Sequence, residues 1–348
     1  MDPQGLSWPA IIGQLADSEL LSSEQARWSM GQILSDSASK DQIKEFLLGI
    51  QARGESPSEV AAFIEVMFEH SAPISIPDRA VDPVGTGGDG ANTINISTTA
   101  AIIASAAGAK VVKHGARAAS SKSGAADVLE ALGVNIDLDG AQVASTFEAT
   151  GIGFCFAPKF HPAMRFAAPA RKELGQASVF NILGPLANPA KPKAISLGVS
   201  KEKMIPVMAE VLMKRGTEGF IFRGDDGIDE ITLSTTSTIV QINDGQMKSE
   251  KFDPQSLGID RAPIESLVGG ESEYNAAVAL RIFSGEKFAP RDAVLLNAAA
   301  AIAAYEGNFG KSITEQLAAG YAKAATAVDS GAALETLKNW AIFTQSFK

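Results

Sequence analysis

The chain has 348 residues, of which 45% are hydrophobic and 20% are charged, a composition typical of a globular protein rather than a disordered one. Its formal net charge of −10 argues against nonspecific binding to nucleic acid or to an anionic membrane surface. The single cysteine, Cys155, excludes an internal disulfide and a cysteine-based zinc site, and it favours a reducing cytoplasm.

The first part of the chain is predicted to be helical, over residues 6–71. Ser22, Ser23 and Glu24 are typical of a helix start, and residues 40–54 and 56–71 carry apolar side chains at three- and four-residue spacing. A proline-rich linker is expected at residues 73–77. We therefore expect a helical domain over residues 1–75. No apolar run reaches the roughly 18 residues of a membrane span, and we expect no signal peptide.

From residue 80 onward, short apolar runs alternate with helical segments. The predicted strands are residues 81–84, 110–113, 134–138, 152–156, 195–199 and 219–223. Predicted helices cover residues 97–107, 124–132, 141–150 and 204–215, and the tail from residue 275 is helical again. This order predicts an α/β domain over residues 80–348, with a mostly parallel central sheet flanked by helices. Residues 161–189 interrupt it with a helix-like insertion, which we expect to join the N-terminal helices.

A glycine-rich loop follows the first predicted strand and precedes a helix that Asn95, Ser97 or Thr98 would cap. Backbone N–H groups and the helix dipole favour an anion there. Three of the glycines match the dinucleotide fingerprint, but the next strand ends in Lys113 and His114 where that motif needs an acid, so we reject this reading. A purely structural turn remains open. If a ligand binds, the glycines allow the main chain to lie against it.

A second polar stretch, residues 113–133, combines three cations with hydroxyl residues after a strand and before a helix. Such donors suit a polyphosphate, although a solvated basic loop would carry the same residues. Loops that follow neighbouring parallel strands meet at one edge of the sheet, where ligands bind in open α/β folds. We therefore expect this stretch and the glycine loop to form one site.

A third stretch, residues 223–232, is acidic, with four carboxylates in six positions. Asp229 and Glu230 offer the hard oxygen ligands that Mg²⁺ prefers, and Asp89 could join them, although an acidic turn is the alternative. A basic cradle facing this loop would suit a magnesium–pyrophosphate ligand. In the helical insertion, Arg171 could clamp a carboxylate and His161 could orient or deprotonate an acceptor, unless both are ordinary surface or core residues.

Seven blocks in order give the sequence a family resemblance. These are GTGGDGANTINIST, KHGARAASSKSGAADVLEALG, FAPKFHPAM, ARKELG, FNILGPLANP, GDDGIDE and PRDAVLLNAAAA. Together they resemble the anthranilate phosphoribosyltransferases of tryptophan biosynthesis, from about Trp8 to the end of the chain. The resemblance implies a homodimer built through the helical parts. It also implies transfer of the ribosyl group of phosphoribosyl pyrophosphate to the amine of anthranilate, with Mg²⁺.

The resemblance also implies roles for individual residues. The diphosphate and ribose would be held by Gly85, Gly88, Asp89, Thr93, Asn95, Ser97 and Thr98. The phosphates would also meet Lys113, Arg117, Ser120 and Ser121. The metal ions would be bound by Ser97, Asp229 and Glu230. The acceptor path would be lined by Ala116, Ala157, His161, Gly184 and Pro185, with Arg171 facing the anthranilate carboxylate. The candidate catalytic residues are Lys113, Asp89 and His161.

The sequence departs from the family pattern mainly on the acceptor side. Ala116 stands where the family has asparagine, and losing that amide could cost roughly 0.5–1.5 kcal/mol of acceptor binding. Ala125, Ala177 and Phe222-Arg223 are further departures. Three alternatives therefore stay open: a phosphoribosyltransferase for another aromatic acceptor, a pyrimidine nucleoside phosphorylase, and a noncatalytic nucleic-acid-binding protein, which the net charge disfavours.

Overall fold

The structure is a computed structural model that describes residues 6–118 and 121–348. Its first lobe is helical and consists of α1 (Trp8–Ala16), α2 (Ser23–Leu34), α3 (Lys40–Arg53) and α4 (Pro57–Glu69). The hydroxyls of Ser22 and Ser39 cap α2 and α3, and a glutamine three residues later completes each capping box. The predicted helical region and its start at Ser22 are thus confirmed. None of the helices in the described residues is long and apolar enough to cross a membrane.

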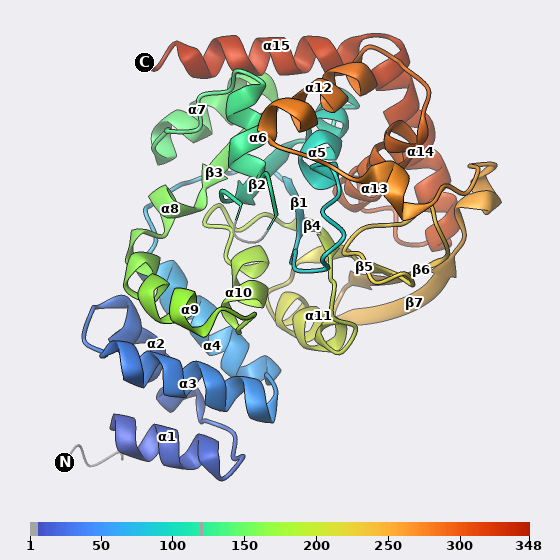
Figure 1. Cartoon of the computed structure of the whole chain (residues 1–348). Coiled ribbons are helices and arrows are strands. Elements are labelled where there is room, and N and C mark those ends of the chain that lie inside the picture. The colour runs from blue at the N-terminus through green and yellow to red at the C-terminus, as the bar shows by residue number, and fades with distance from the viewer. Residues whose placement is uncertain (1–5, 119–120) are drawn as a thin grey trace.

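A seven-stranded sheet forms the centre of the second lobe, in the order β3-β2-β1-β4-β5-β6-β7 (Figure 1). Five strands are parallel: β1 (Val81–Gly85), β2 (Val111–Gly115), β3 (Ile152–Phe156), β4 (Ala194–Gly198) and β5 (Glu218–Gly224). The edge is an antiparallel hairpin of β6 (Ser237–Asn243) and β7 (Gln246–Phe252). The predicted α/β domain with a mostly parallel sheet is confirmed.

One predicted strand was wrong, and one hairpin was missed. Residues 134–138 alternate like a strand and bury their apolar side chains, but they form no ladder, and Asn135 N–H donates to Thr344 Oγ1 at 3.0 Å. The β6–β7 hairpin was not predicted, because β7 is almost entirely exposed and has no apolar alternation to reveal it.

Helices cover both faces of the sheet. One core is formed by α5 (Ile96–Ala106), α13 (Ala289–Glu306), α14 (Ile313–Asp329) and α15 (Ala332–Gln345), with α12 (Ser272–Phe283) beside them. In α13 nearly every residue is buried, and the helix contacts β1, β4 and β5. The remaining helices of this lobe are α6 (Ala125–Ala131), α7 (Gly140–Thr150) and α11 (Met204–Lys214), with 3-10 turns at Pro254–Leu257 and Ile264–Leu267.

The helical insertion contacts the first lobe. It contains α8 (Ala157–Phe160), a 3-10 turn (Pro162–Phe166), α9 (Ala168–Leu174) and α10 (Phe180–Leu186). Helix α9 packs on α3, and α10 packs on α4 (Figure 1). A second core runs from α1–α4 through α10 and α11 to the other face of the sheet. The division at residues 75–80 therefore stays a proposal about domain boundaries.

Candidate active site

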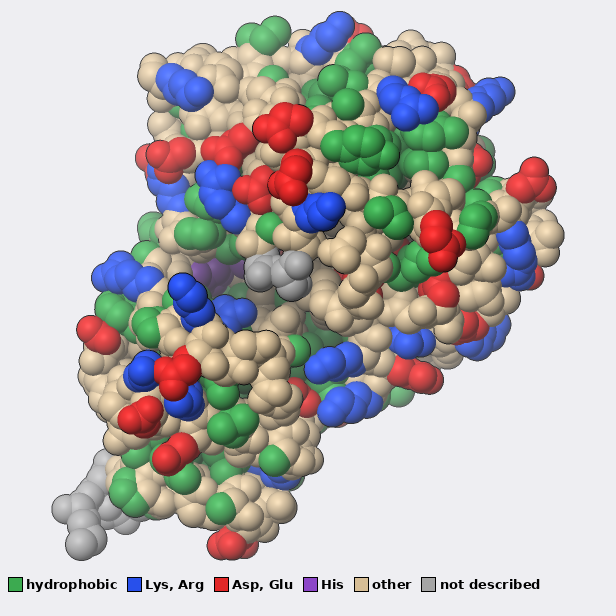
Figure 2. Space-filling view, in the orientation of Figure 1, with side chains coloured by type: hydrophobic (Ala, Val, Ile, Leu, Met, Phe, Trp, Pro, Cys, Tyr) green, Lys and Arg blue, Asp and Glu red, His purple; other side chains and the backbone are tan. Residues whose placement is uncertain are grey.

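The residues singled out in the sequence come mostly from the carboxyl ends of β1, β2 and β5. In Figure 2 the surface is hollowed between the helical lobe and the α/β lobe, with histidine side chains inside the hollow and Lys and Arg side chains around it. A parallel sheet gathers its loops at this edge, which is why stretches far apart in the sequence meet there.

The glycine loop after β1 adopts a backbone that only glycine accepts without strain. Gly87, Gly88 and Gly90 have φ of 61°, 75° and 78°, and a Cβ at any of them would meet no atom within 4 Å. Thr86 N–H donates to Gly198 O at 3.0 Å, and Ser200 Oγ donates to Gly87 O at 2.8 Å. The loop is thus fixed at its base, while its glycines border open space that a ligand could fill.

Gly85 has a different reason for lacking a side chain. It pairs with Gly198 across β1 and β4, and the loop after β5 passes directly over both. A Cβ at Gly85 would lie 2.3 Å from Asp229 Oδ2, and one at Gly198 would lie 1.6 Å from Asp229 O. The prediction that the glycines clear space for a ligand is therefore wrong for Gly85, where the space is taken by the protein's own acidic loop.

The acidic loop places Asp229 and Glu230 against the start of α5, and both side chains are buried. Gly87 N–H donates to Asp229 Oδ2 at 2.6 Å. Burial, reinforced by the charge of Asp89, raises the pKa of Asp229 to about 6. Burial and the neighbouring Asp229 raise the pKa of Glu230 well above its usual range. The structure thus brings together Ser97, Asp229, Glu230 and Asp89.

Lys113 lies buried in the middle of β2, and its Nζ donates to Pro83 O and, at 3.3 Å, to Ser97 Oγ. Burial lowers the pKa of Lys113, while the carboxylates Asp82, Glu230 and Asp229 act in the opposite direction. One ammonium group therefore faces several acids in a site largely shielded from water. A bound cation would stabilise the ionised form of these acids, whose pKa values burial raises.

The donor set suits Mg²⁺ in particular. Mg²⁺ commonly takes one or two protein carboxylates and completes its shell with water and ligand phosphates. Residues 6–118 and 121–348 contain no group of three or more His, Cys, Asp or Glu side chains arranged as a metal site. A metal held here would therefore complete its shell with water or with oxygens of a bound ligand.

Asn95 connects the glycine loop to the polar stretch after β2. It occupies the N-cap position of α5 without capping it; instead Nδ2 donates to Ser123 O at 3.0 Å, and Oδ1 accepts from Asn275 Nδ2 at 2.8 Å. Thr93 forms an isolated bridge with Val268, and Thr98 is buried in the first turn of α5. The amide of Asn95 thus orders the neighbouring loop.

The predicted phosphate contacts after β2 are only partly assembled. Arg117 is about half exposed, and its guanidinium pairs with Asp127 at 2.9 Å and with Glu130, so it does not face the acid pair. Ser121 Oγ donates to Ser123 O at 3.3 Å. Ser120 lies outside the described residues. Ala116 is exposed on this loop.

The predicted acceptor residues lie where the insertion meets β2. His161 Nε2 and Ala187 O are 2.8 Å apart, and its ring stands edge-on to His114 with centroids 5.2 Å apart. Burial lowers the pKa of both histidines, that of His114 to about 3, so both rings are neutral at pH 7. The contact of His114 Nδ1 with Gly184 O, at 3.1 Å, ties this pair to α10, which also contains Pro185.

Arg171 is the predicted partner for a carboxylate. Its guanidinium lies over the Phe180 ring at 5.2 Å, and burial lowers its pKa. Within the described part of the chain Arg171 forms no salt bridge with any of the protein's own acids. A partly desolvated cation of this kind suits an anionic ligand. Ala157 begins α8 in the same insertion.

Two buried polar residues near the site were missed from the sequence. Asp82 in β1 is fully buried and accepts from Asn188 Nδ2 at 2.8 Å and from His114 N–H at 3.2 Å. Burial raises the pKa of Asp82 to about 6. An acid inside an apolar strand is a sequence signal that could have identified it. The second missed residue is Asn297, a single buried amide in the alanine-rich helix α13.

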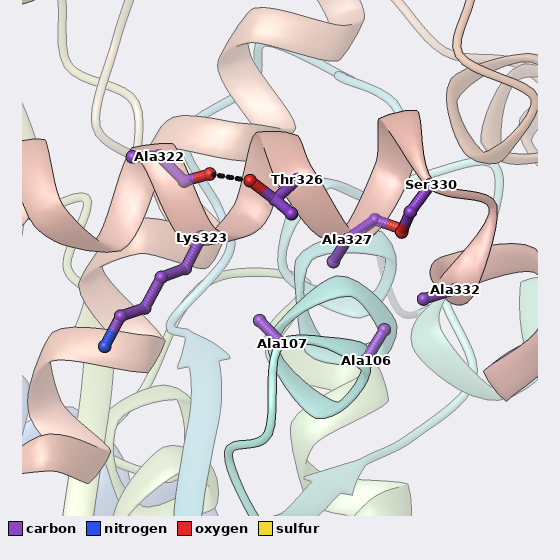
Figure 3. A pocket seen from close by; sticks show the side chains of 8 residues that line it. All are labelled: Ala106, Ala107, Ala322, Lys323, Thr326, Ala327, Ser330 and Ala332. Carbon is purple, nitrogen blue, oxygen red and sulfur yellow. Dashed lines mark hydrogen bonds between the residues drawn. The ribbon is translucent and has the colours of Figure 1, made fainter.

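A separate depression of about 380 Å³ lies between α14 and the carboxyl end of α5 (Figure 3). Ala106, Ala107 and Ala327 line it, and Thr326 Oγ1 donates to Ala322 O at 2.9 Å. This is the opposite end of α5 from Ser97. Its lining is mostly small side chains, so it lacks the groups that the predicted chemistry needs.

Comparison with known proteins assigns the family. Residues 9–71 match the helical bundle domain of a glycosyl transferase family, and residues 77–334 match its a/b domain. Anthranilate phosphoribosyltransferase of Rhodococcus jostii is 50% identical over 97% of this chain and 93% of that protein. The Thermobifida fusca enzyme of the same name is 49% identical, covering 98% of this chain and 97% of its own.

Solved structures agree. The crystal structure of anthranilate phosphoribosyltransferase from Thermus thermophilus superimposes with a TM-score of 0.89 at 39% identity, covering 96% of this chain and 99% of that one. The Saccharomyces cerevisiae enzyme in complex with phosphoribosyl pyrophosphate and Mg gives 0.87 at 28% identity, covering 97% and 98%. The chain therefore belongs to the anthranilate phosphoribosyltransferase family.

Proposed function

We propose that the chain transfers the phosphoribosyl group of phosphoribosyl pyrophosphate to the amine of anthranilate, giving N-(5-phosphoribosyl)anthranilate and pyrophosphate in tryptophan biosynthesis. Family membership supports the reaction. The observation that carries it is the open glycine loop at Gly87–Gly90 lying against the buried acids Asp229 and Glu230. A magnesium-bridged diphosphate needs backbone donors and carboxylate ligands side by side.

We assign the donor half of the site to three groups. The backbone N–H group of Gly88 would meet the diphosphate, with Asp89, Thr93, Asn95 and Thr98 around the ribose. Gly87 N–H holds Asp229, and Gly85 leaves room for the acidic loop. Mg²⁺ would be held by Ser97, Asp229 and Glu230, and it would neutralise charge on the pyrophosphate. Ser120 and Ser121 would meet phosphate, and so would Arg117 once it leaves Asp127 and Glu130.

Catalysis on this assignment is mainly electrostatic. As the bond from ribose C1 to pyrophosphate lengthens, negative charge grows on the leaving group, and Lys113 with the glycine-loop N–H groups would stabilise it. The anthranilate amine is already neutral at pH 7 and needs positioning rather than deprotonation. Arg171 would hold its carboxylate, and neutral His161 would orient the ring beside Ala116, Ala157, Gly184 and Pro185. Asp89 would orient the ribose.

The reaction is tested by following the loss of anthranilate fluorescence on adding phosphoribosyl pyrophosphate and Mg²⁺. We expect no change when either is omitted. A panel of aromatic amines and nucleobases tests the other acceptor that Ala116 suggests, and phosphate-dependent thymidine cleavage tests the phosphorylase alternative. Turnover of another acceptor, with anthranilate left untouched, would overturn the assignment of the substrate.

We also infer a homodimer formed through the helical lobe, in the cytoplasm. The dimer is supported by Leu20 and Leu48, which expose 58% and 42% of their surface on this lobe. The cytoplasmic location is supported by Cys155, which is a free, buried thiol. Sedimentation should give twice the chain mass, and Leu48→Glu should shift it toward the monomer. A monomeric wild-type chain at micromolar concentration would exclude the dimer.

A further inference from the structure

Asn297 is a polar residue in an otherwise apolar stretch of α13. Its neighbours from Ala293 to Ala304 are Ala, Val, Leu and Ile, and all of them are buried. The amide itself is only 3% exposed. A buried amide is costly unless its hydrogen bonds are made, so its partners reveal what it is for.

Those partners include both polar groups of one residue in the acidic loop. Ile231 N–H donates to Asn297 Oδ1 at 3.0 Å, and Asn297 Nδ2 donates to Ile231 O at 3.1 Å. The second amide hydrogen goes to Ala293 O at 2.9 Å, which fixes the side chain on its own helix. Ile231 directly follows Glu230, and its side chain is fully buried.

The acidic loop has little regular structure of its own to hold it. Residues 225–236 form turns and bends between β5 and β6. On the side of the sheet, Asp229 packs against Gly85 and Gly198, and no side chain would fit at either glycine. From the other side, Asn297 is the side chain that binds the main chain next to Glu230. The loop is therefore held between the sheet and α13.

We propose that Asn297 is a positioning residue for Asp229 and Glu230, setting the carboxylates for the magnesium–diphosphate complex through the Ile231 backbone. The proposal rests on the function proposed above for the acid pair. Metal ligands must be held within about 0.5 Å of the productive geometry, and supporting hydrogen bonds of this kind typically change metal affinity 10–100-fold. Asn297 lies behind the acid pair, so it would act without touching the ligand.

The test compares Asn297→Leu and Asn297→Ala with the matched control Gln316→Leu. Gln316 is likewise a buried amide, and its Nε2 donates to Gln241 Oε1 at 2.8 Å, but it has no hydrogen bond to the acidic loop. Calorimetry measures binding of phosphoribosyl pyrophosphate in the presence of Mg²⁺. Each variant is used at a temperature where thermal unfolding shows it to be fully folded.

We expect both Asn297 variants to bind phosphoribosyl pyrophosphate with Mg²⁺ at least 10-fold more weakly, with the KM for anthranilate changed less than 2-fold. Gln316→Leu should lose stability but keep wild-type binding. Wild-type affinity in both folded Asn297 variants would overturn the positioning role alone. A wild-type chain that binds no phosphoribosyl pyrophosphate would overturn the proposed function and this inference with it.

A measurement on the wild-type chain covers the case in which neither variant folds. Hydrogen exchange should show the Ile231 amide as protected as the amides of α13. If the Ile231 amide instead exchanged at the rate of an exposed loop, the positioning role of Asn297 would be overturned.

Discussion

The contact between Gly198 and Asp229 makes Gly198→Ala the sharpest test of how the acidic loop is seated. Gly198 is paired on both sides, with Gly85 of β1 and with Phe222 of β5, so the strand cannot easily move away. The added Cβ would lie 1.6 Å from Asp229 O, whereas ordinary contact begins at 3.4 Å. The carbonyl must therefore retreat by about 1.8 Å. Because Gly198 has no left-handed φ, collision is the whole effect.

Two consequences of that displacement can be estimated. Forcing extra atoms into a packed site costs about 1–3 kcal/mol, and we expect the upper part of that range because the obstacle is backbone. In a chain of this size each kcal/mol lowers the Tm by about 2 °C. A shift of this size also exceeds the roughly 0.5 Å that a binding constellation tolerates. Binding of phosphoribosyl pyrophosphate with Mg²⁺ should weaken at least tenfold, or about 1.4 kcal/mol.

The assay is thermal unfolding together with calorimetric titration. Gly13→Ala is the control, because Gly13 lies in α1, is exposed and has no atom within 4 Å of an added Cβ. It should be neutral or stabilising by up to about 1 kcal/mol, since alanine favours helix. If Gly198→Ala keeps wild-type Tm and wild-type affinity, the acidic loop is not fixed by this contact and the reasoning fails.

Three further predictions follow from the electrostatics and from the acceptor side. Burial raises the pKa of Asp229 to about 6, so above that pH the folded protein carries a buried charge that it lacks at pH 4. The stability of Asp229→Asn relative to wild type should therefore rise between pH 4 and pH 7, by up to about 3 kcal/mol in urea unfolding. A difference in stability that stays the same over this range would contradict the burial argument. Ala116→Asn should lower the KM for anthranilate by roughly 2- to 10-fold and leave that for phosphoribosyl pyrophosphate unchanged, so equal shifts in both constants would refute an acceptor role. Arg171→Gln should raise the KM for anthranilate at least tenfold while calorimetry shows wild-type affinity for phosphoribosyl pyrophosphate, and the opposite pattern would place Arg171 on the donor side.

The meeting of Ser97, Lys113 and Asp229 could be predicted from sequence because Ser97 lies at the start of α5, Lys113 lies in β2 and Asp229 lies in the loop after β5. Topology brings such positions to one edge whatever the loops between them do. Asn297 could not be predicted in this way, since it reaches Ile231 from 66 residues further along the chain. Only its polarity within an apolar helix signals a buried partner, and sequence does not say which one.

Other errors have equally local causes. Residues 134–138 have the period-two pattern of a strand, but a pattern reports which side chains are buried and not which backbone groups are paired. The backbone N–H and the side-chain amide of Asn135 both donate to Thr344 of α15. Gly85 illustrates the limit for glycines. Its sequence context matched a ligand-binding loop, yet the atom that excludes a side chain there comes from Asp229, 144 positions away in the printed sequence.

The hydrophobic core that passes from α1–α4 through α10 and α11 onto the sheet has a consequence for dissecting the molecule. Severing the chain after residue 75 would strip the apolar sides of α9 and α10 of their cover, and those helices belong to the piece that remains. Neither fragment would be an autonomous module. Shuffling of the N-terminal helices between relatives would therefore succeed only when the insertion is exchanged along with them.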